Sequence, residues 1–153
     1  MQKGSTWFLR AIIYGLGLAG AGILTILAGV SFSGNAGNYL PVLLYMFLPA
    51  VPFYVALYQG LQLLKFIDTN TAFADKSAKA LRTIKYAAFT MSALYAAGMP
   101  IFIYVADKDD APGVVLVGLV FTMAPLVIGV FAAVLERLME NALQIKSEND
   151  LTV

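Results

Sequence analysis

An uninterrupted uncharged stretch constrains the fold of this chain more than any other feature. No Asp, Glu, Lys or Arg occurs from residue 11 to residue 64. One helix crosses the hydrocarbon core of a bilayer in about 20 residues, so this stretch is long enough for two crossings. Turn-forming residues at 31–38, Ser-Phe-Ser-Gly-Asn-Ala-Gly-Asn, divide it. We therefore predict transmembrane helices near residues 10–32 and 40–66.

Two further uncharged runs, residues 86–106 and 111–135, are each long enough to cross a bilayer once. Backbone polar groups in lipid need internal partners, which favours helices. The sequence therefore predicts an all-α integral membrane bundle of four transmembrane helices, with the last two near residues 84–106 and 111–146. We expect residues 1–153 to form a single membrane domain that ends in a polar tail at 147–153.

Composition agrees with a lipid environment. Hydrophobic residues make up 60% of the chain and charged residues 12%, whereas soluble domains average about 25% charged residues. The net charge of +1 gives no global attraction to nucleic acid, and we expect no direct contact with it. Cysteine and histidine are both absent, which excludes disulfides, thiolate catalysis and Cys-based metal sites. No metal or cofactor is expected.

The distribution of Lys and Arg predicts the orientation. All basic residues except Lys108 lie before the uncharged run at 11–64, between that run and the one at 86–106, or after the run at 111–135. Short loops rich in Lys and Arg stay in the cytoplasm. We therefore expect both termini and the middle loop on the cytoplasmic side of the membrane.

Two shorter helical features are expected on that side. In the middle loop, residues 72–81 with candidate caps Asn70 and Thr71 predict a short interfacial helix. After Leu135, continued helical periodicity predicts a cytoplasmic extension of the fourth helix by about two to three turns.

The first helix has an alternative interpretation as a signal peptide, because Lys3 precedes an apolar run and small residues follow at Ser31 and Ser33. The run is about 20 residues long, whereas signal peptides usually carry 7 to 15 apolar residues. We therefore favour a retained helix.

Glycines in the first helix match a nucleotide-binding fingerprint by letter only. The segment 15–20, Gly-Leu-Gly-Leu-Ala-Gly, fits G-x-G-x-x-G. That motif requires a preceding strand and an acidic residue about 20 positions later, but the first acidic residue is Asp68. We instead expect small residues that allow close helix packing, namely Gly15, Ala19, Gly20 and Gly22.

Acidic residues and prolines mark the helix boundaries. Asp107, Asp109 and Asp110 could coordinate a hard cation, but we favour a role at the start of the fourth helix, where negative charge suits the helix dipole. Pro49 and Pro52 predict that the second helix is the most bent.

The uncharged runs that form the membrane-crossing parts of the four predicted helices, residues 11–64, 86–106 and 111–135, contain no Asp, Glu, Lys or Arg. Transporters and proton pumps generally keep such residues inside the membrane. No evident catalytic base or activated nucleophile is present either, so we predict that the protein is not an enzyme. The eight tyrosines are expected to anchor and pack the helices, and a lipophilic ligand pocket among the aromatic residues is the alternative.

Five short segments in the second half carry a family resemblance. They are Asn-Thr-Ala-Phe at 70–73, Leu-Arg-Thr-Ile-Lys-Tyr at 81–86, Gly-Met-Pro at 98–100, Asp-Lys-Asp-Asp-Ala-Pro-Gly at 107–113 and Ile-Lys-Ser-Glu-Asn-Asp-Leu-Thr-Val at 145–153. With these segments the chain resembles the YoaS-like family of bacterial membrane proteins. The resemblance implies a four-helix inner-membrane protein that is often encoded beside a small Cro/C1-type helix-turn-helix regulator.

These observations lead us to expect a non-enzymatic regulatory membrane protein that binds or sequesters such a regulator. An oligomeric exporter or channel subunit is the alternative, and the basic series in the middle loop could simply fix the topology. The partner-binding candidates are Lys76, Lys79, Arg82, Lys85, Arg137, Glu140, Lys146, Glu148, Asn149 and Asp150.

Overall fold

The structure is a computed structural model that describes residues 2–35, 37–69 and 74–152. Every element in these ranges is a helix: α1 (Gln2–Phe32), the short 3₁₀ helix η1 (Gly37–Tyr39), α2 (Leu40–Tyr45), α3 (Ala50–Asp68), α4 (Asp75–Lys108) and α5 (Gly113–Leu151). Four of them, α1, α3, α4 and α5, are long and apolar enough to cross a membrane. The predicted all-α fold with four transmembrane helices is confirmed.

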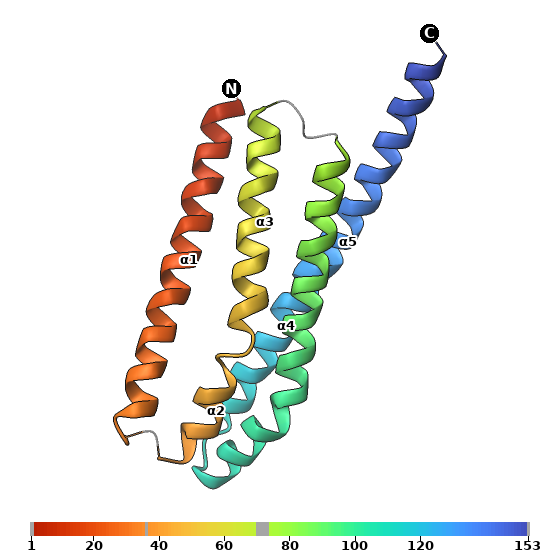
Figure 1. Cartoon of the computed structure of the whole chain (residues 1–153). Coiled ribbons are helices and arrows are strands. Elements are labelled where there is room, and N and C mark those ends of the chain that lie inside the picture. The colour runs from red at the N-terminus through yellow and green to blue at the C-terminus, as the bar shows by residue number, and fades with distance from the viewer. Residues whose placement is uncertain (1, 36, 70–73, 153) are drawn as a thin grey trace.

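The four long helices form a row and not a closed ring (Figure 1). α1 packs on α3 and α2, α3 packs on α4, and α4 makes its most extensive contact with α5. Among the described residues, the backbones of α3 and α5 do not approach one another, and α1 reaches neither α4 nor α5. Most apolar side chains of α1 and α5 therefore face outward, where lipid can cover them.

Small residues bring α4 and α5 together. A Cβ atom on Gly129 of α5 would lie 2.7 Å from the Phe89 ring of α4, and one on Gly118 would lie 2.8 Å from the Met99 sulfur. Such close approach is how membrane helices gain van der Waals contact without a hydrophobic driving force. Next to Gly118, Phe102 of α4 is 1% exposed.

Within one copy of the chain, the structure places one of the four packing residues predicted on α1 against a neighbouring helix. Only Gly20 lies in a close contact, since a Cβ atom there would be 2.8 Å from the Phe53 ring of α3. Gly15 and Gly22 have open space around them and Ala19 is exposed. Small residues occur on all sides of α1, whereas only one side of that helix has a protein neighbour.

The predicted helix at 40–66 is interrupted. α2 ends at Tyr45, residues 46–49 form tight turns, and α3 begins at Ala50. The turns retain backbone hydrogen bonds, because Leu48 N–H donates to the Tyr45 carbonyl (3.1 Å) and Ala50 N–H to that of Phe47 (3.3 Å). Pro49 precedes α3 and Pro52 lies in its first turn, where a missing N–H is harmless. Where we expected a bend in one helix, the structure has two separate helices, α2 and α3.

The predicted middle-loop and tail boundaries also need correction. Asn70 and Thr71 lie outside the described residues, but the segment from Asp75 onward is the continuous start of α4 and not a separate interfacial helix. α5 continues to Leu151, so most of the predicted polar tail at 147–153 is helical.

The loop before α5 differs from the expected cap. Asp110 has a φ of 50° and lies in the connecting turn, while Pro112 occupies the N-cap position of α5. Asp109 instead accepts a hydrogen bond from the Asn38 amide at 2.8 Å. Within the described residues, no group of three or more acidic side chains could hold a metal ion.

Candidate docking site at the basic end

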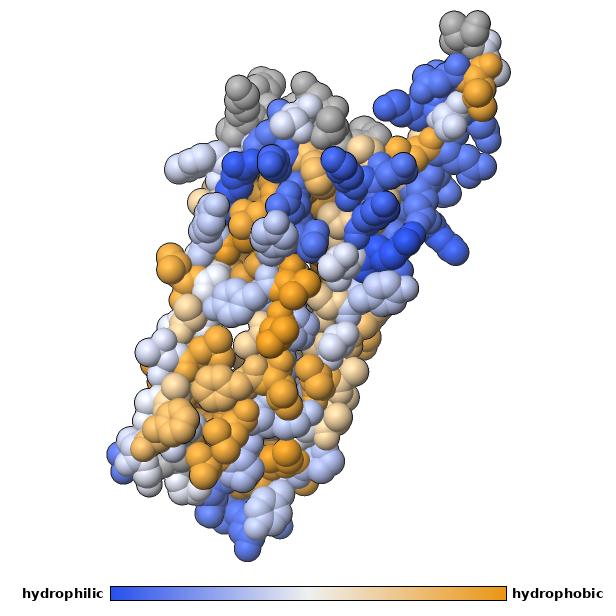
Figure 2. Space-filling view, in the orientation of Figure 1, coloured by the Kyte–Doolittle hydropathy of each residue, from blue (hydrophilic) through white to orange (hydrophobic). Residues whose placement is uncertain are grey.

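Most basic side chains gather at one end of the molecule. α1 begins and α5 ends there (Figure 1), and the hydrophilic residues of this end are separated by an apolar band from a smaller hydrophilic tip at the opposite end (Figure 2). We call it the basic end. Its described basic residues are Arg10, Lys65, Lys76, Lys79, Arg82, Lys85, Arg137 and Lys146.

A charge cluster joins α4 to α5 where the apolar run of α5 stops. The Glu136 carboxylate follows that run, is only 5% exposed, and accepts from Arg82 Nε at 2.7 Å and Lys85 Nζ at 2.6 Å. A second nitrogen of Arg82 contacts the Glu140 carboxylate at 3.0 Å. A buried carboxylate persists where several partners compensate its lost hydration. The hydrogen bonds from Lys85 and Arg82 lower the pKa of Glu136.

A second charge pair joins α1 to α3. The Asp68 carboxylate at the end of α3 accepts from an Arg10 nitrogen at 2.6 Å and from the Thr6 hydroxyl at 2.6 Å. Both contacts lie at the basic end, so α1 is tied to its one long neighbour there. Sequence reasoning missed the charge cluster and this second charge pair. In each, the residues that meet come from different helices and lie more than fifty positions apart in the sequence.

The structure divides the predicted partner-binding residues into two groups. Arg82, Lys85 and Glu140 belong to the charge cluster and are engaged within the molecule. The others are exposed and form no ion pair among the described residues. We call this second group the docking surface: Lys76, Lys79, Arg137, Lys146, Glu148, Asn149 and Asp150.

The two helices that carry the docking surface are neighbours. Ala74 and Asp75, at the start of α4, line a shallow hollow together with Leu143 and Lys146 of α5. At this end α5 projects past the other helices (Figure 1). Leu138, Ile145 and Leu151 are 59%, 67% and 83% exposed on the segment that follows Glu136. A helix with polar and exposed apolar side chains outside the apolar band can be recognised by another protein.

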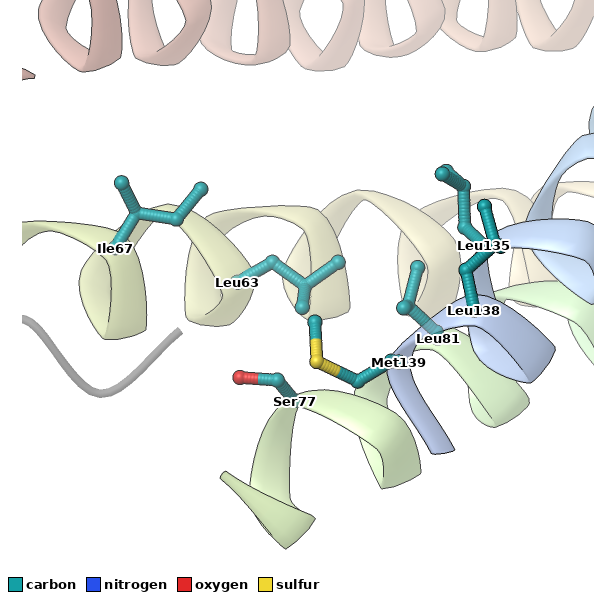
Figure 3. Close-up of a pocket in the computed structure, with 7 residues that line it drawn as sticks. All are labelled: Leu63, Ile67, Ser77, Leu81, Leu135, Leu138 and Met139. Carbon is teal, nitrogen blue, oxygen red and sulfur yellow. The ribbon is translucent and has the colours of Figure 1, made fainter. Parts of the chain in front are cut away.

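An apolar groove lies beside the charge cluster. Its volume is about 340 Å³. Two α3 residues form one side, α4 supplies Ser77 and Leu81, and α5 forms the other side (Figure 3). The lining is Leu63, Ile67, Ser77, Leu81, Leu135, Leu138 and Met139. The lipophilic pocket considered among aromatic residues is therefore not this one, because its lining is aliphatic.

Comparison with known proteins places the chain in a family. Residues 30–153 match the family described as "Protein of unknown function (DUF2975)". The chain is also 55% identical over 112 residues to "Uncharacterized membrane protein YoaS" of Bacillus subtilis (strain 168), which covers 73% of this chain and 70% of that protein. No solved structure matches. The chain is thus a multi-pass membrane protein that belongs to the DUF2975 family and is related to YoaS.

Proposed function

We propose that this protein is a non-enzymatic regulatory membrane protein that binds a cytoplasmic protein through its docking surface. The observation that carries the proposal is the projection of α5 beyond the bundle as an exposed helix. Its polar and apolar side chains lie beyond the apolar run that ends at Leu135. A helix in this position offers a protein partner an extended surface.

The charge cluster supports such a role by holding the base of the extension. Glu136 is paired with two α4 side chains, so α5 leaves the apolar band in a defined direction. A rigid surface loses less conformational freedom when a partner binds, which favours affinity. The unpaired lysines of α4, Lys76 and Lys79, lie beside this base and add positive charge for an acidic partner.

The proposed orientation of the protein in the membrane follows from the rule that short loops rich in Lys and Arg stay in the cytoplasm. The basic end contains all the described Lys and Arg residues except Lys108, so the rule directs it to the cytoplasm of a bacterial inner membrane. The end of α5, from residue 147 to the C-cap at residue 152, would then lie in the same compartment as a transcription regulator.

The partner proposed is a small helix-turn-helix regulator, as the YoaS-like resemblance implies. Contact with DNA would belong to that partner, because the docking surface mixes Lys76 and Lys79 with Glu148 and Asp150 and lacks a continuous basic face. Holding the regulator at the membrane would withdraw it from its operator.

The open row of helices supports a second candidate function, an oligomeric exporter or channel subunit. α1 contacts α3 and α2 alone among the described elements, so one copy encloses no path across the membrane. Several copies would have to assemble around a pore. Flux into liposomes at increasing protein density tests this alternative, and no flux at any density rejects it.

Retention of the proposed helix-turn-helix regulator on membranes tests the main proposal. The regulator is co-expressed with the intact protein, with Lys76→Glu/Lys79→Glu, with a chain lacking residues 147–153, and with Lys108→Glu as the matched control at the opposite end. We expect the intact protein and the control to retain the regulator and the other two to release it. Equal retention by all four, with equal amounts in the membrane, would reject the proposal.

A further inference from the structure

We propose that the groove between α3, α4 and α5 binds one acyl chain of an anionic phospholipid from the surrounding bilayer, with the lipid headgroup at the basic end. This site goes beyond the partner-binding role. It would exist whether or not a regulator docks on α5.

The groove is an apolar space that the described part of the chain leaves unfilled. α4 lies between α3 and α5, and the backbones of those two helices do not meet. Leu63 of α3 and Leu138 of α5 face the space from either side, above the buried α4 residue Leu81 (Figure 3). Its volume of about 340 Å³ is at the lower end of the range for small-molecule sites.

Hydrocarbon suits this space better than water. Ser77 is the one polar side chain among the seven that line it, and water needs two to four polar partners to occupy a cavity. An acyl chain would restore the dispersion contacts that the facing side chains otherwise lose. Because the groove is only partly enclosed, a chain could enter it without unfolding of the protein.

The position of the groove along the membrane normal determines how a bound lipid is oriented. Leu81 and Leu135 line it, and the next residues along their helices, Arg82 and Glu136, belong to the charge cluster. The groove thus lies where the apolar band ends. A chain held there has its headgroup beside the basic end and not near the Asp107–Asp110 loop.

The charges around the groove complement an anionic headgroup. Lys76 adjoins Ser77 in sequence, Lys79 follows within a turn, and Lys146 lies about two turns beyond Met139 on the same face of α5. None of these three lysines forms an ion pair among the described residues. Asp75 and Asp150 line the neighbouring hollow together with Lys146, whereas Lys76 and Lys79 do not line that hollow. Basic pockets between transmembrane helices are a recognised type of anionic lipid site.

A lipid in this groove would connect α3 to α5, whose backbones do not approach one another. Leu138 and Met139 lie at the base of the projecting segment. Occupancy would therefore restrict the angle at which the docking surface leaves the membrane. This consequence rests on the proposed function, whereas lipid binding itself does not.

Native mass spectrometry of the full chain tests the site. The protein is transferred from nanodiscs of equal phosphatidylglycerol and phosphatidylcholine into mild detergent, and the retained lipid is identified. We expect about one phosphatidylglycerol per chain. Retention should be lost in Leu138→Trp, which fills the groove, and kept in Val130→Trp, an α5 side chain that is 51% exposed and does not line it.

A charge variant tests the headgroup contact separately. In Lys76→Gln/Lys79→Gln/Lys146→Gln, we expect preference for phosphatidylglycerol over phosphatidylcholine to fall by about fivefold for each lysine that contacts the lipid. Lys108→Gln, at the opposite end, should leave the preference unchanged.

Three results would overturn the proposal. They are no lipid retained by the intact protein, equal retention of both phospholipids, or a dimer that Leu138→Trp dissociates while lipid retention stays the same. The last result would assign the groove to a second copy of the chain. Regulator binding is scored in a separate assay, so failure of the lipid site and failure of the proposed function remain distinguishable.

Discussion

The Lys85 ammonium lies 2.6 Å from the Glu136 carboxylate, and this contact joins α4 to α5 at the level where the apolar run of α5 ends. Glu136 is 5% exposed, so its charge depends on protein partners for compensation. Arg82 supplies the second partner from the same helix. The position of the docking surface therefore depends on one carboxylate and two cations.

Removing the Glu136 charge should loosen the α4–α5 contact. We expect Glu136→Gln to lower the free energy of unfolding by about 1 to 2 kcal/mol, less than for a fully buried pair because the Arg82 side chain is half exposed. Glu140→Gln is the control, because Glu140 is 47% exposed and its loss should cost at most about 1 kcal/mol. Thermal unfolding in detergent gives both values, and equal losses would contradict the assigned role.

Acid should weaken the same contact. The pKa of Glu136 is lowered from its ordinary value of 4.5 by the Lys85 and Arg82 hydrogen bonds. A lowered folded-state pKa adds stability that is fully present above the unfolded value and is lost as pH falls through the folded value. The contribution of Glu136 to the unfolding temperature should therefore be constant at neutral pH. It should be lost progressively as the pH falls below 4.5. The difference in unfolding temperature between the intact protein and Glu136→Gln should shrink there, and a constant difference would contradict this.

Two glycine substitutions should have opposite effects. Gly129→Ala places a Cβ atom 2.7 Å from the Phe89 ring, and overpacking of this kind costs about 1 to 3 kcal/mol. Gly22→Ala on α1 meets no atom within 4 Å and should stabilise its helix by up to about 1 kcal/mol. Thermal unfolding of the two variants in one detergent measures the contrast. Equal destabilisation would show that α1 packs against more than α2 and α3.

Hydropathy was sufficient to predict the four spans, because the absence of charge over residues 11–64 leaves few other folds for that segment. Helix limits were less predictable. The start of α4 at Asp75 and the helical end of α5 bring together residues such as Ala74 and Leu143, which line one hollow although they are distant in the sequence.

The packing surfaces could not be assigned from residue size alone. Gly15 and Gly22 are as small as Gly118 and Gly129, but only the latter two face a neighbouring helix. The groove was missed for the same reason, because its lining comes from three helices and its aliphatic side chains have no distinctive motif. The exposed residues at the end of α5 were predictable, since polar side chains resume after Leu135.

The orientation of the basic end is the central claim, because the proposed docking surface requires access to the cytoplasm. The chain contains no cysteine, so Gln144→Cys on α5 and Asp109→Cys at the opposite end can each be labelled without background by a membrane-impermeant maleimide. We predict that intact spheroplasts label Asp109→Cys alone and that inverted vesicles label Gln144→Cys alone. Labelling of Gln144→Cys in intact spheroplasts would contradict the account.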